Sequence, residues 1–303
     1  MNIGIIGAGY MGSMHARIIS KLPGCALCGI TAKTPAKASL LAKELNVGFV
    51  ESIRELLEDE DIDIIDICSP TETHSEIACR CMEAGKDVII EYPICTNKIE
   101  LDELRKASRK SGKACAGAYY SRFQSQYKYF FELSKTDEIG EIRSLSISRK
   151  SSSVFSSNDI VNNLMAQDID AAVQLLGLPL SVECMNNQQN DCVLVFKYES
   201  AIVTIDGSTN MHDNYPFTTR HSVSGKNGSA TLDWSFVDCP KSKMVYSNNS
   251  GQRTLDIGDY DPYQYELEHI INGIAVKNTA NFDIESMYNS ANLAFKCRDM
   301  LKK

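Results

Sequence analysis

The sequence predicts an α/β chain with a doubly wound parallel sheet, followed by an α+β region with a large, mostly antiparallel open sheet. Residues 1–118 alternate short apolar runs with helical stretches, as strands buried on both faces of a parallel sheet do. The first apolar run ends in a glycine-rich turn that leads into a helix. After residue 119, several strands follow one another across short turns, which is typical of antiparallel pairing.

We therefore expect two domains, residues 1–118 and 119–303, and the last helix could pack back on the first domain. Expected helices of the first domain end at Gly85 and Gly112, because glycine readily closes a helix. Strands are expected there at 2–6, 26–31, 47–50, 61–68, 87–90 and 114–117, with helices at 13–21, 73–84 and 97–111. The second domain should have helices at 124–134, 160–176, 261–276 and 284–301, and strands at 142–149, 182–186, 191–198, 201–207, 220–225, 229–233, 243–247 and 252–257.

The most informative motif is the GxGxxG turn that follows the first strand. A strand, this turn and then a helix form the fingerprint of a dinucleotide-binding (Rossmann) unit. The helix N-terminus would offer free amide hydrogens and a positive dipole end to the phosphates. We expect cofactor contacts from Gly7, Ala8, Gly9, Tyr10, Met11 and Gly12. The alternative is a glycine-rich turn that binds nothing.

The end of the second strand bears on which dinucleotide is bound. An NAD site usually has an acidic residue there to hold the ribose 2′-hydroxyl. Ala32 occupies that position, and Lys33, Thr34 and Lys37 follow it. Lysine and a hydroxyl would pair with a 2′-phosphate, so the sequence favours NADP(H) over NAD(H). The alternative is that the lysines are only solvated and that either cofactor fits.

Composition excludes several classes of function. The chain has 303 residues and a net charge of −8, and its basic residues are scattered, so neither nucleic acid nor a membrane surface is an expected partner. No apolar run approaches the length of a membrane span, and the N-terminus enters a strand at once, which predicts a cytoplasmic protein without a signal peptide. The eleven cysteines lack zinc spacing, so we expect reduced thiols and no metal site.

Five segments in order carry a resemblance to a known family: residues 4–12, 68–74, 84–93, 118–123 and 138–143. Together they resemble the glucose-fructose oxidoreductase / inositol dehydrogenase (Gfo/Idh/MocA) family. The resemblance implies an NAD(P)-dependent oxidoreductase with a small-molecule substrate. It also implies a homodimer or homotetramer formed through the open sheet of the second domain.

The resemblance assigns roles to residues at the strand ends. Ser69, Pro70 and Thr71 would lie along the ribose and phosphates of the cofactor. His74 would lie near the cofactor, or would simply begin a helix. Glu91 and Pro93 match a Glu-Lys-Pro motif that borders the nicotinamide.

The catalytic residues of the family are not retained. Tyr92 replaces the lysine of Glu-Lys-Pro, and neutral Asn163 and Gln167 replace an Asp and a His that handle protons; Asp170 is kept. Asn and Gln do not titrate, whereas a phenol with a pKa near 10 is suited to donating a proton. Biliverdin reductases of this family also have Glu-Tyr-Pro.

These observations predict an NADP(H)-dependent reductase that acts on a C=O, C=N or conjugated C=C group, with Tyr92 as the catalytic residue. The spacing of Asn163, Gln167 and Asp170 predicts one shared helix face. Arg122 would contact substrate or pair with a nearby acid. The predicted substrate contacts are Tyr120, Arg122, Asn163, Gln167 and Asp170. Three alternatives remain open: a sugar or polyol dehydrogenase with an altered proton relay, a non-catalytic dinucleotide sensor, and a scaffold that binds partners through the sheet face and binds no nucleotide.

Overall fold

The computed structural model describes residues 1–152, 159–187, 190–236, 240–255 and 261–301. The chain forms two compact units. The first comprises Met1–Tyr120 and Asp261–Tyr288, and the second comprises Ser121–Tyr260 and Asn289–Lys303. The predicted domain limits, 1–118 and 119–303, placed residues 261–288 with the second part of the chain. In the structure these residues group with the first unit.

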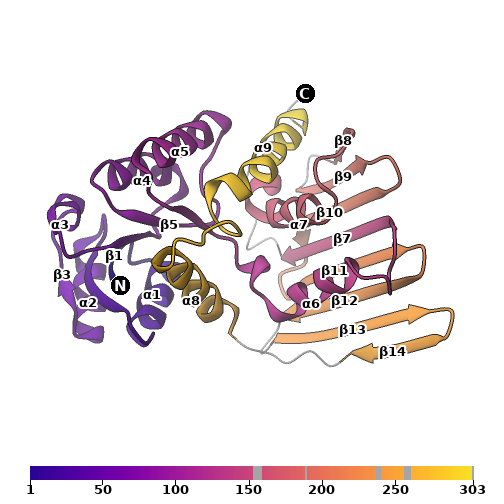
Figure 1. The fold of residues 1–303 in the computed structure, drawn as a ribbon, viewed down its shortest axis with the longest axis horizontal. Coiled ribbons are helices and arrows are strands. Elements are labelled where there is room, and N and C mark those ends of the chain that lie inside the picture. Colours follow the sequence, from indigo (N-terminus) through magenta and orange to yellow (C-terminus); the bar gives the residue numbers. More distant parts are fainter. Residues whose placement is uncertain (153–158, 188–189, 237–239, 256–260, 302–303) are drawn as a thin grey trace. The chain divides into compact units, whose positions relative to one another are not determined.

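The first unit contains a six-stranded parallel sheet with the order β3-β2-β1-β4-β5-β6 (Figure 1). The strands are β1 (Asn2–Ile6), β2 (Ala26–Thr31), β3 (Gly48–Phe49), β4 (Ile64–Ile67), β5 (Asp87–Glu91) and β6 (Cys115–Ala118). The chain winds outward in both directions from β1 and β4, which confirms the predicted doubly wound sheet. In such sheets ligands bind at the carboxyl ends of the strands where the order reverses.

Helices cover this sheet, and its strands are apolar because both faces are buried. Ile3, Ile5, Ile64 and Ile65 are fully buried. The helices are α1 (Tyr10–Ile19), α2 (Pro35–Leu45), α3 (Ile53–Glu58), α4 (His74–Glu83), α5 (Lys98–Ser111) and α8 (Pro262–Ala275), with a 3₁₀ turn η1 (Thr71–Thr73) before α4. Helix α8 contacts α1 and β6, although it comes late in the chain. Helix α9 (Ile284–Leu301) begins in the first unit and ends in the second.

The second unit contains an eight-stranded sheet with the order β14-β13-β12-β11-β7-β10-β9-β8. The strands are β7 (Ile142–Ser152), β8 (Ser181–Asn186), β9 (Asp191–Lys197), β10 (Ile202–Met211), β11 (Phe217–Gly225), β12 (Gly228–Phe236), β13 (Pro240–Asn248) and β14 (Gly251–Leu255). Among the described strands of this second sheet, only β7 and β10 pair in parallel, so the predicted, mostly antiparallel sheet is confirmed. Residues 256 and 257, which the sequence assigned to the last strand, lie outside the described residues.

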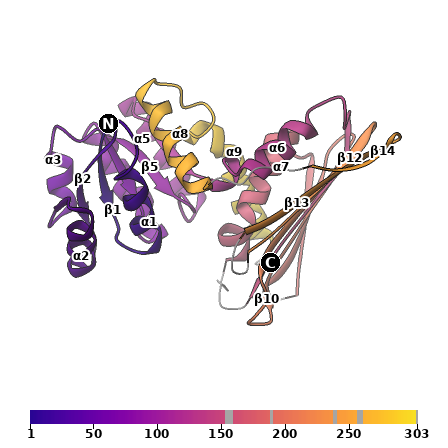
Figure 2. The same ribbon diagram turned by 90° about the horizontal axis from the view of Figure 1, so that it is seen from below.

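One face of this sheet is covered by α6 (Ser125–Ser134) and α7 (Ala166–Leu176), and the other is open (Figure 2). Along β7, Leu145 and Ile147 are buried on the covered face, whereas the preceding residues Ser144 and Ser146 are exposed. This alternation is the period-two pattern of a sheet with one solvated face. None of the helices in the described part of the chain has the length and apolarity that a bilayer span requires.

Candidate functional site

The glycine turn between β1 and α1 is tight because two of its glycines admit no side chain. Gly7 has a φ of +119°, and a Cβ there would lie 2.4 Å from the carbonyl oxygen of Cys68. A Cβ on Gly12 would lie 2.1 Å from the carbonyl oxygen of Gly7. Because neither glycine has a side chain, the start of α1 can lie directly against the ends of β1 and β4.

The N-terminus of α1 is suited to an anion. Gly9 is its N-cap residue and provides no side-chain cap, and the first helical turn has no acidic residue. A Cβ on Gly9 would meet nothing within 4 Å, so the backbone there faces open space. Free amides, the positive helix end and this open cradle fit a pyrophosphate. The helix begins at Tyr10, earlier than the predicted residue 13, because the last residues of the glycine motif, Tyr10–Gly12, are already helical.

The end of β2 lies beside this turn, since the amide of Gly7 donates to the carbonyl oxygen of Thr31 at 2.8 Å. Ala32 is half-buried, and Lys33, Thr34 and Lys37 are exposed. Within the described residues, neither lysine makes an ion pair with a carboxylate. Helix α2 has no side-chain cap and no acidic residue in its first turn.

A cavity of about 660 Å³ connects these two features. Its lining includes Ala8, Gly9 and Tyr10 at the start of α1, together with Lys37 of α2. Asp261 and Gln264 at the start of α8 also line it. The cavity therefore joins the anion-binding end of α1 to a basic side chain near the end of β2.

His74 joins the turns that follow β4 and β5. Its Nδ1 lies 2.9 Å from the carbonyl oxygen of Pro93, and its Nε2 lies 2.7 Å from that of Ser69. Carbonyl oxygens only accept, so both contacts are hydrogen bonds only when the ring is an imidazolium. The Oγ1 of Thr73 donates to the carbonyl oxygen of Pro70 at 2.7 Å and lies 2.7 Å from the Oγ of Ser69. Both ring nitrogens of His74 are thus engaged within the protein.

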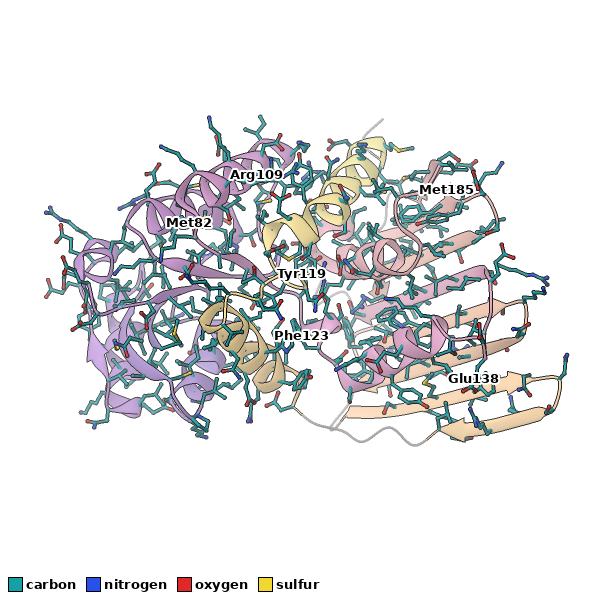
Figure 3. The ribbon with its side chains drawn as sticks, in the orientation of Figure 1. Met82, Arg109, Tyr119, Phe123, Glu138 and Met185 are labelled. Carbon is teal, nitrogen blue, oxygen red and sulfur yellow. The ribbon has the colours of Figure 1, made fainter. Side chains whose placement is uncertain are left out.

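Four tyrosines lie around the end of β5 and the residues after β6. The rings of Tyr92 and Tyr119 meet edge to face, with centroids 5.1 Å apart and an interplanar angle of 74° (Tyr119 is labelled in Figure 3). Tyr120 stacks on Tyr263 of α8 at 5.5 Å and 28°. Burial raises the pKa of the Tyr263 phenol, and Tyr120 and Glu91 raise it further. Tyr263 was not among the predicted site residues, because nothing in the local sequence pattern shows where α8 packs.

A buried group of titratable residues lies beneath the glycine turn and was also missed. His15 Nδ1 lies 2.9 Å from Asp66 Oδ2, and both side chains are fully buried. His15 Nε2 lies 3.3 Å from Glu91 Oε2, without hydrogen-bond geometry. Glu266 of α8 is 1% exposed, and its Oε1 has no hydrogen-bond partner among the residues that the structure describes. A histidine at the sixth position of α1, facing strand ends, is the only sequence signal that pointed toward this group.

Burial and mutual proximity shift the pKa values of this group. Burial by itself lowers the pKa of His15, but Cys68 and Asp66 outweigh it, and the pKa lies well above its usual value of 6.5. Burial raises the pKa of Glu266 well above its usual value of 4.5, and Glu91 adds to this effect. Burial also raises the pKa of the Cys68 thiol to about 12. These directions favour a cationic His15, a neutral Glu266 and a neutral Cys68 thiol.

Two of the predicted substrate residues of the second unit, Arg122 and Asp170, are paired with each other. Arg122 donates to both carboxylate oxygens of Asp170, at 2.7 and 2.6 Å, and Ser290 donates to the same carboxylate at 2.6 Å. This is the ion pair that the sequence left open as the alternative for Arg122. Gln167 is buried, and its Oε1 accepts from the amide of Ser121 at 3.3 Å.

Asn163 does not share a face with the other two residues of the predicted set. The helix expected over 160–176 begins as a π-helix, η4 (Val161–Met165), before α7. The wider π turn changes the angular position of residues before Ala166, so i, i+4 spacing no longer implies one face. Asn163 is exposed, whereas Gln167 and Asp170 are buried.

Comparisons with known proteins agree with this geometry. Residues 1–119 match the GFO_IDH_MocA model, described as an oxidoreductase family with an NAD-binding Rossmann fold. The chain is 27% identical over 248 residues to the uncharacterized oxidoreductase YrbE of Bacillus subtilis, a match that covers 76% of this chain and 73% of YrbE. It is 26% identical over 184 residues to myo-inositol 2-dehydrogenase of Thermotoga maritima, covering 58% of this chain and 55% of the relative.

Solved structures show the same fold along the whole chain. UDP-N-acetylglucosamine 3-dehydrogenase GnnA from Acidithiobacillus ferrooxidans aligns with a TM-score of 0.85 and 20% identity, covering 99% of this chain and 97% of that one. The 3-ketoreductase KijD10 from Actinomadura kijaniata, in complex with NADP, aligns with a TM-score of 0.82 and 15% identity over the same shares. At these identities the likeness shows the fold alone.

The parallel sheet, the dinucleotide-binding turn and these matches are those of the NAD(P)-binding oxidoreductases. Residues 1–119 match the model of the Gfo/Idh/MocA family, which confirms the resemblance seen in the sequence. The likeness to the Glu-Tyr-Pro motif of biliverdin reductases is not tested by these matches and stays a prediction.

Proposed function

We propose that this protein is an NADP(H)-dependent reductase of a C=O, C=N or conjugated C=C group in a small molecule. The observation that carries the proposal is Tyr92 at the end of β5, where the family usually has lysine. The helix that should supply a base instead presents an exposed amide, Asn163, and a buried amide, Gln167. A proton donor is therefore present at the strand end, while neither amide can act as a base.

The preference for NADP(H) rests on charge at the end of β2. Ala32 brings no carboxylate, and Lys33 and Lys37 are exposed without an acidic partner among the described residues. Lys37 lines the same cavity as Gly9, so a cation lies near the phosphate-binding turn. A 2′-phosphate would gain charge-assisted contacts at this end of the site. Binding of NADP by the structurally similar ketoreductase KijD10 is in keeping with this choice.

The protein's own residues would then do three things. The turn Gly7–Gly12 binds the pyrophosphate, and His74 holds the turns after β4 and β5 in place. The phenol of Tyr92 supplies the proton, either directly or through a water, while the bound dinucleotide supplies the hydride. Tyr120, Arg122, Asn163, Gln167 and Asp170 remain the proposed substrate contacts. Asp170 would then act mainly by holding the guanidinium of Arg122.

Stopped-flow mixing of the protein with NADPH and a panel of ketones, imines and conjugated enones tests this function. Oxidation of NADPH by members of the panel, with loss of the rate in Tyr92→Phe, is expected. Reduction of NADP⁺ by polyols alone would instead support the sugar or polyol dehydrogenase. Binding of NADPH without turnover of any compound would support the non-catalytic sensor.

We also propose a cytoplasmic homodimer or homotetramer formed through the open face of the second unit's sheet. Met185 on β8 and Ile202 on β10 are each 54% exposed in the single chain (Met185 is labelled in Figure 3). Burial of these side chains against a second copy would remove apolar surface from water. Light scattering after size-exclusion chromatography tests this, and a monomer at micromolar concentration would contradict it.

A further inference from the structure

The buried group beneath the glycine turn, hereafter the His15 cluster, consists of His15, Asp66, Glu91 and Glu266. Its four side chains come from α1, β4, β5 and α8. Asp66 and Glu91 lie on opposite sides of the His15 ring, at 2.9 Å from Nδ1 and 3.3 Å from Nε2. Three of the four residues are no more than 1% exposed, and the side chain of Glu91 is 16% exposed.

Solvent screens a buried charge only weakly. The net charge of the cluster therefore changes the binding free energy of a charged group that binds next to it. Glu91 is the last residue of β5, at the carboxyl edge where ligands of doubly wound sheets bind. Three carboxyl groups and one imidazole share the cluster. An imidazolium between two carboxylates, with Glu266 neutral, leaves one net negative charge at the edge of the binding site.

Oxidised and reduced nicotinamide rings differ by one positive charge. A negative cluster beside the ring therefore binds the oxidised form more tightly than the reduced form, and the number of protons in the cluster sets the difference. We propose that the His15 cluster is the site that sets the relative affinity of the protein for NADP⁺ and NADPH. This proposal rests on the proposed function, because it requires the nicotinamide to lie beside Glu91.

The groups around the cluster limit what else could set this charge. Cys68, in the turn after β4, faces His15 at 3.4 Å and carries a thiol whose pKa burial raises to about 12. Tyr263 of α8 faces Glu91 and Glu266, with Tyr120 and Tyr10 nearby, and the phenol of Tyr263 also has a raised pKa. With raised pKa values, the Cys68 thiol and the Tyr263 phenol are neutral at neutral pH. We therefore assign the variable protons of the cluster to His15 and Glu266, whose pKa values are both raised above their usual values.

His15, Asp66 and Cys68 could also hold a metal ion, since their ligand atoms lie within 4.8 Å of one another. The charge proposal is favoured because His15 Nδ1 and Asp66 already form a close ion pair. Nε2 then points at Glu91 rather than at a further ligand. A metal would also require a deprotonated Cys68, against the direction of its pKa.

Fluorescence and calorimetric titration of the full chain with NADP⁺ and with NADPH, over pH 6 to about 9, measure the ratio of the two dissociation constants. His15→Gln removes the cation, so the affinity for NADP⁺ relative to that for NADPH should rise by on the order of tenfold at neutral pH. Glu266→Gln should leave the ratio of the two dissociation constants unchanged at neutral pH. Above neutral pH, the variant should lose part of the pH dependence of this ratio. Ser20→Ala, at the C-terminal end of α1 and outside the lining of the cavity, alters no titratable group and serves as the control.

An unchanged ratio in His15→Gln, with dinucleotide still bound, would overturn the proposal and leave the proposed function standing. If His15→Gln does not fold, a pH dependence in Glu266→Gln identical to that of the parent protein would overturn it instead. A ratio that changes when EDTA removes a bound metal would also overturn it, in favour of the metal site. Failure of the parent protein to bind either dinucleotide would overturn the proposed function and this inference together.

Discussion

Arg122 and Asp170 form a bidentate ion pair in the second unit, with nitrogen–oxygen distances of 2.7 and 2.6 Å. The side chains are 12% and 2% exposed, and Ser290 donates a further hydrogen bond to the carboxylate. Asp170, the acidic residue that the sequence retains from the family pattern, therefore forms an ion pair with Arg122. A substrate that meets Arg122 would meet a guanidinium whose direction is fixed.

Replacing Asp170 with Asn should strongly destabilise the protein, because it removes the negative charge that the largely buried guanidinium of Arg122 faces. Breaking such a pair costs about 3–5 kcal/mol. The exposed pair Arg220–Asp233, 64% and 43% exposed, gives a matched control. Asp233→Asn should cost less than about 1 kcal/mol. Urea unfolding measures both, and equal losses would contradict the structural weight assigned to the buried pair.

Gly9→Ala should fold normally and bind dinucleotide poorly. A Cβ at this position meets no protein atom within 4 Å, and its φ of −80° suits alanine. The methyl group would instead occupy the space over the N-terminus of α1. We expect dissociation constants for NADPH to rise roughly tenfold or more, since overpacking costs about 1–3 kcal/mol. Unchanged affinity in a normally folded variant would show that the phosphates lie elsewhere.

Lys33→Glu should reverse the cofactor preference. The carboxylate would repel a 2′-phosphate and could accept a hydrogen bond from a 2′-hydroxyl. NADPH should bind about tenfold more weakly, while NADH binds as well as before or better. Lys43→Glu alters charge equally on the exposed side of α2 and is the control. Parallel losses in the two variants would mean that net charge, rather than position, governs binding.

Tyr92→Phe should lower the catalytic rate constant about a hundredfold or more, because general acid catalysis contributes about 10²–10⁴-fold. The ring contact with Tyr119 is retained by phenylalanine, so NADPH affinity and thermal stability should change little. Single-turnover oxidation of NADPH with an accepted substrate provides the measurement. A variant that keeps the full rate would leave water or another group as the proton donor.

Sequence patterns predicted the sheets because the positions that are buried in a strand are occupied by apolar residues. Apolar runs such as Ile64–Ile67 and the alternation along Ile142–Arg149 both became strands. The glycine turn was predictable for the same local reason, since Gly7 and Gly12 each exclude a Cβ. Such features depend on neighbours in the sequence and on a period that can be counted.

The missed features depend on contacts between distant segments. Glu266 and Tyr263 reach the strand ends only because α8 packs on α1 and β6, which its own amphipathic pattern does not specify. The π turn before α7 was missed because one helical period was counted through Asn163. The sequence therefore yielded the phosphate-binding turn, while the acidic surroundings of Glu91 required the packed structure.

Glu266→Gln should reduce the loss of stability that the parent protein shows as pH rises. The pKa of Glu266 lies well above 4.5 in the folded state, chiefly through burial, and returns to about that value on unfolding. The folded state thus binds more protons between these two values, and the free energy of unfolding falls as pH rises through that window. Each unit of upward shift in the pKa corresponds to about 1.4 kcal/mol in the free energy of unfolding.

His15, whose pKa is also raised, still makes the free energy of unfolding of the Glu266→Gln variant fall above pH 6.5. Thermal unfolding from pH 5 to about 9 measures the difference, and exposed Glu60→Gln should retain the full slope of the parent protein. A Glu266→Gln profile parallel to that of the parent would mean that this carboxyl is already ionised in the fold.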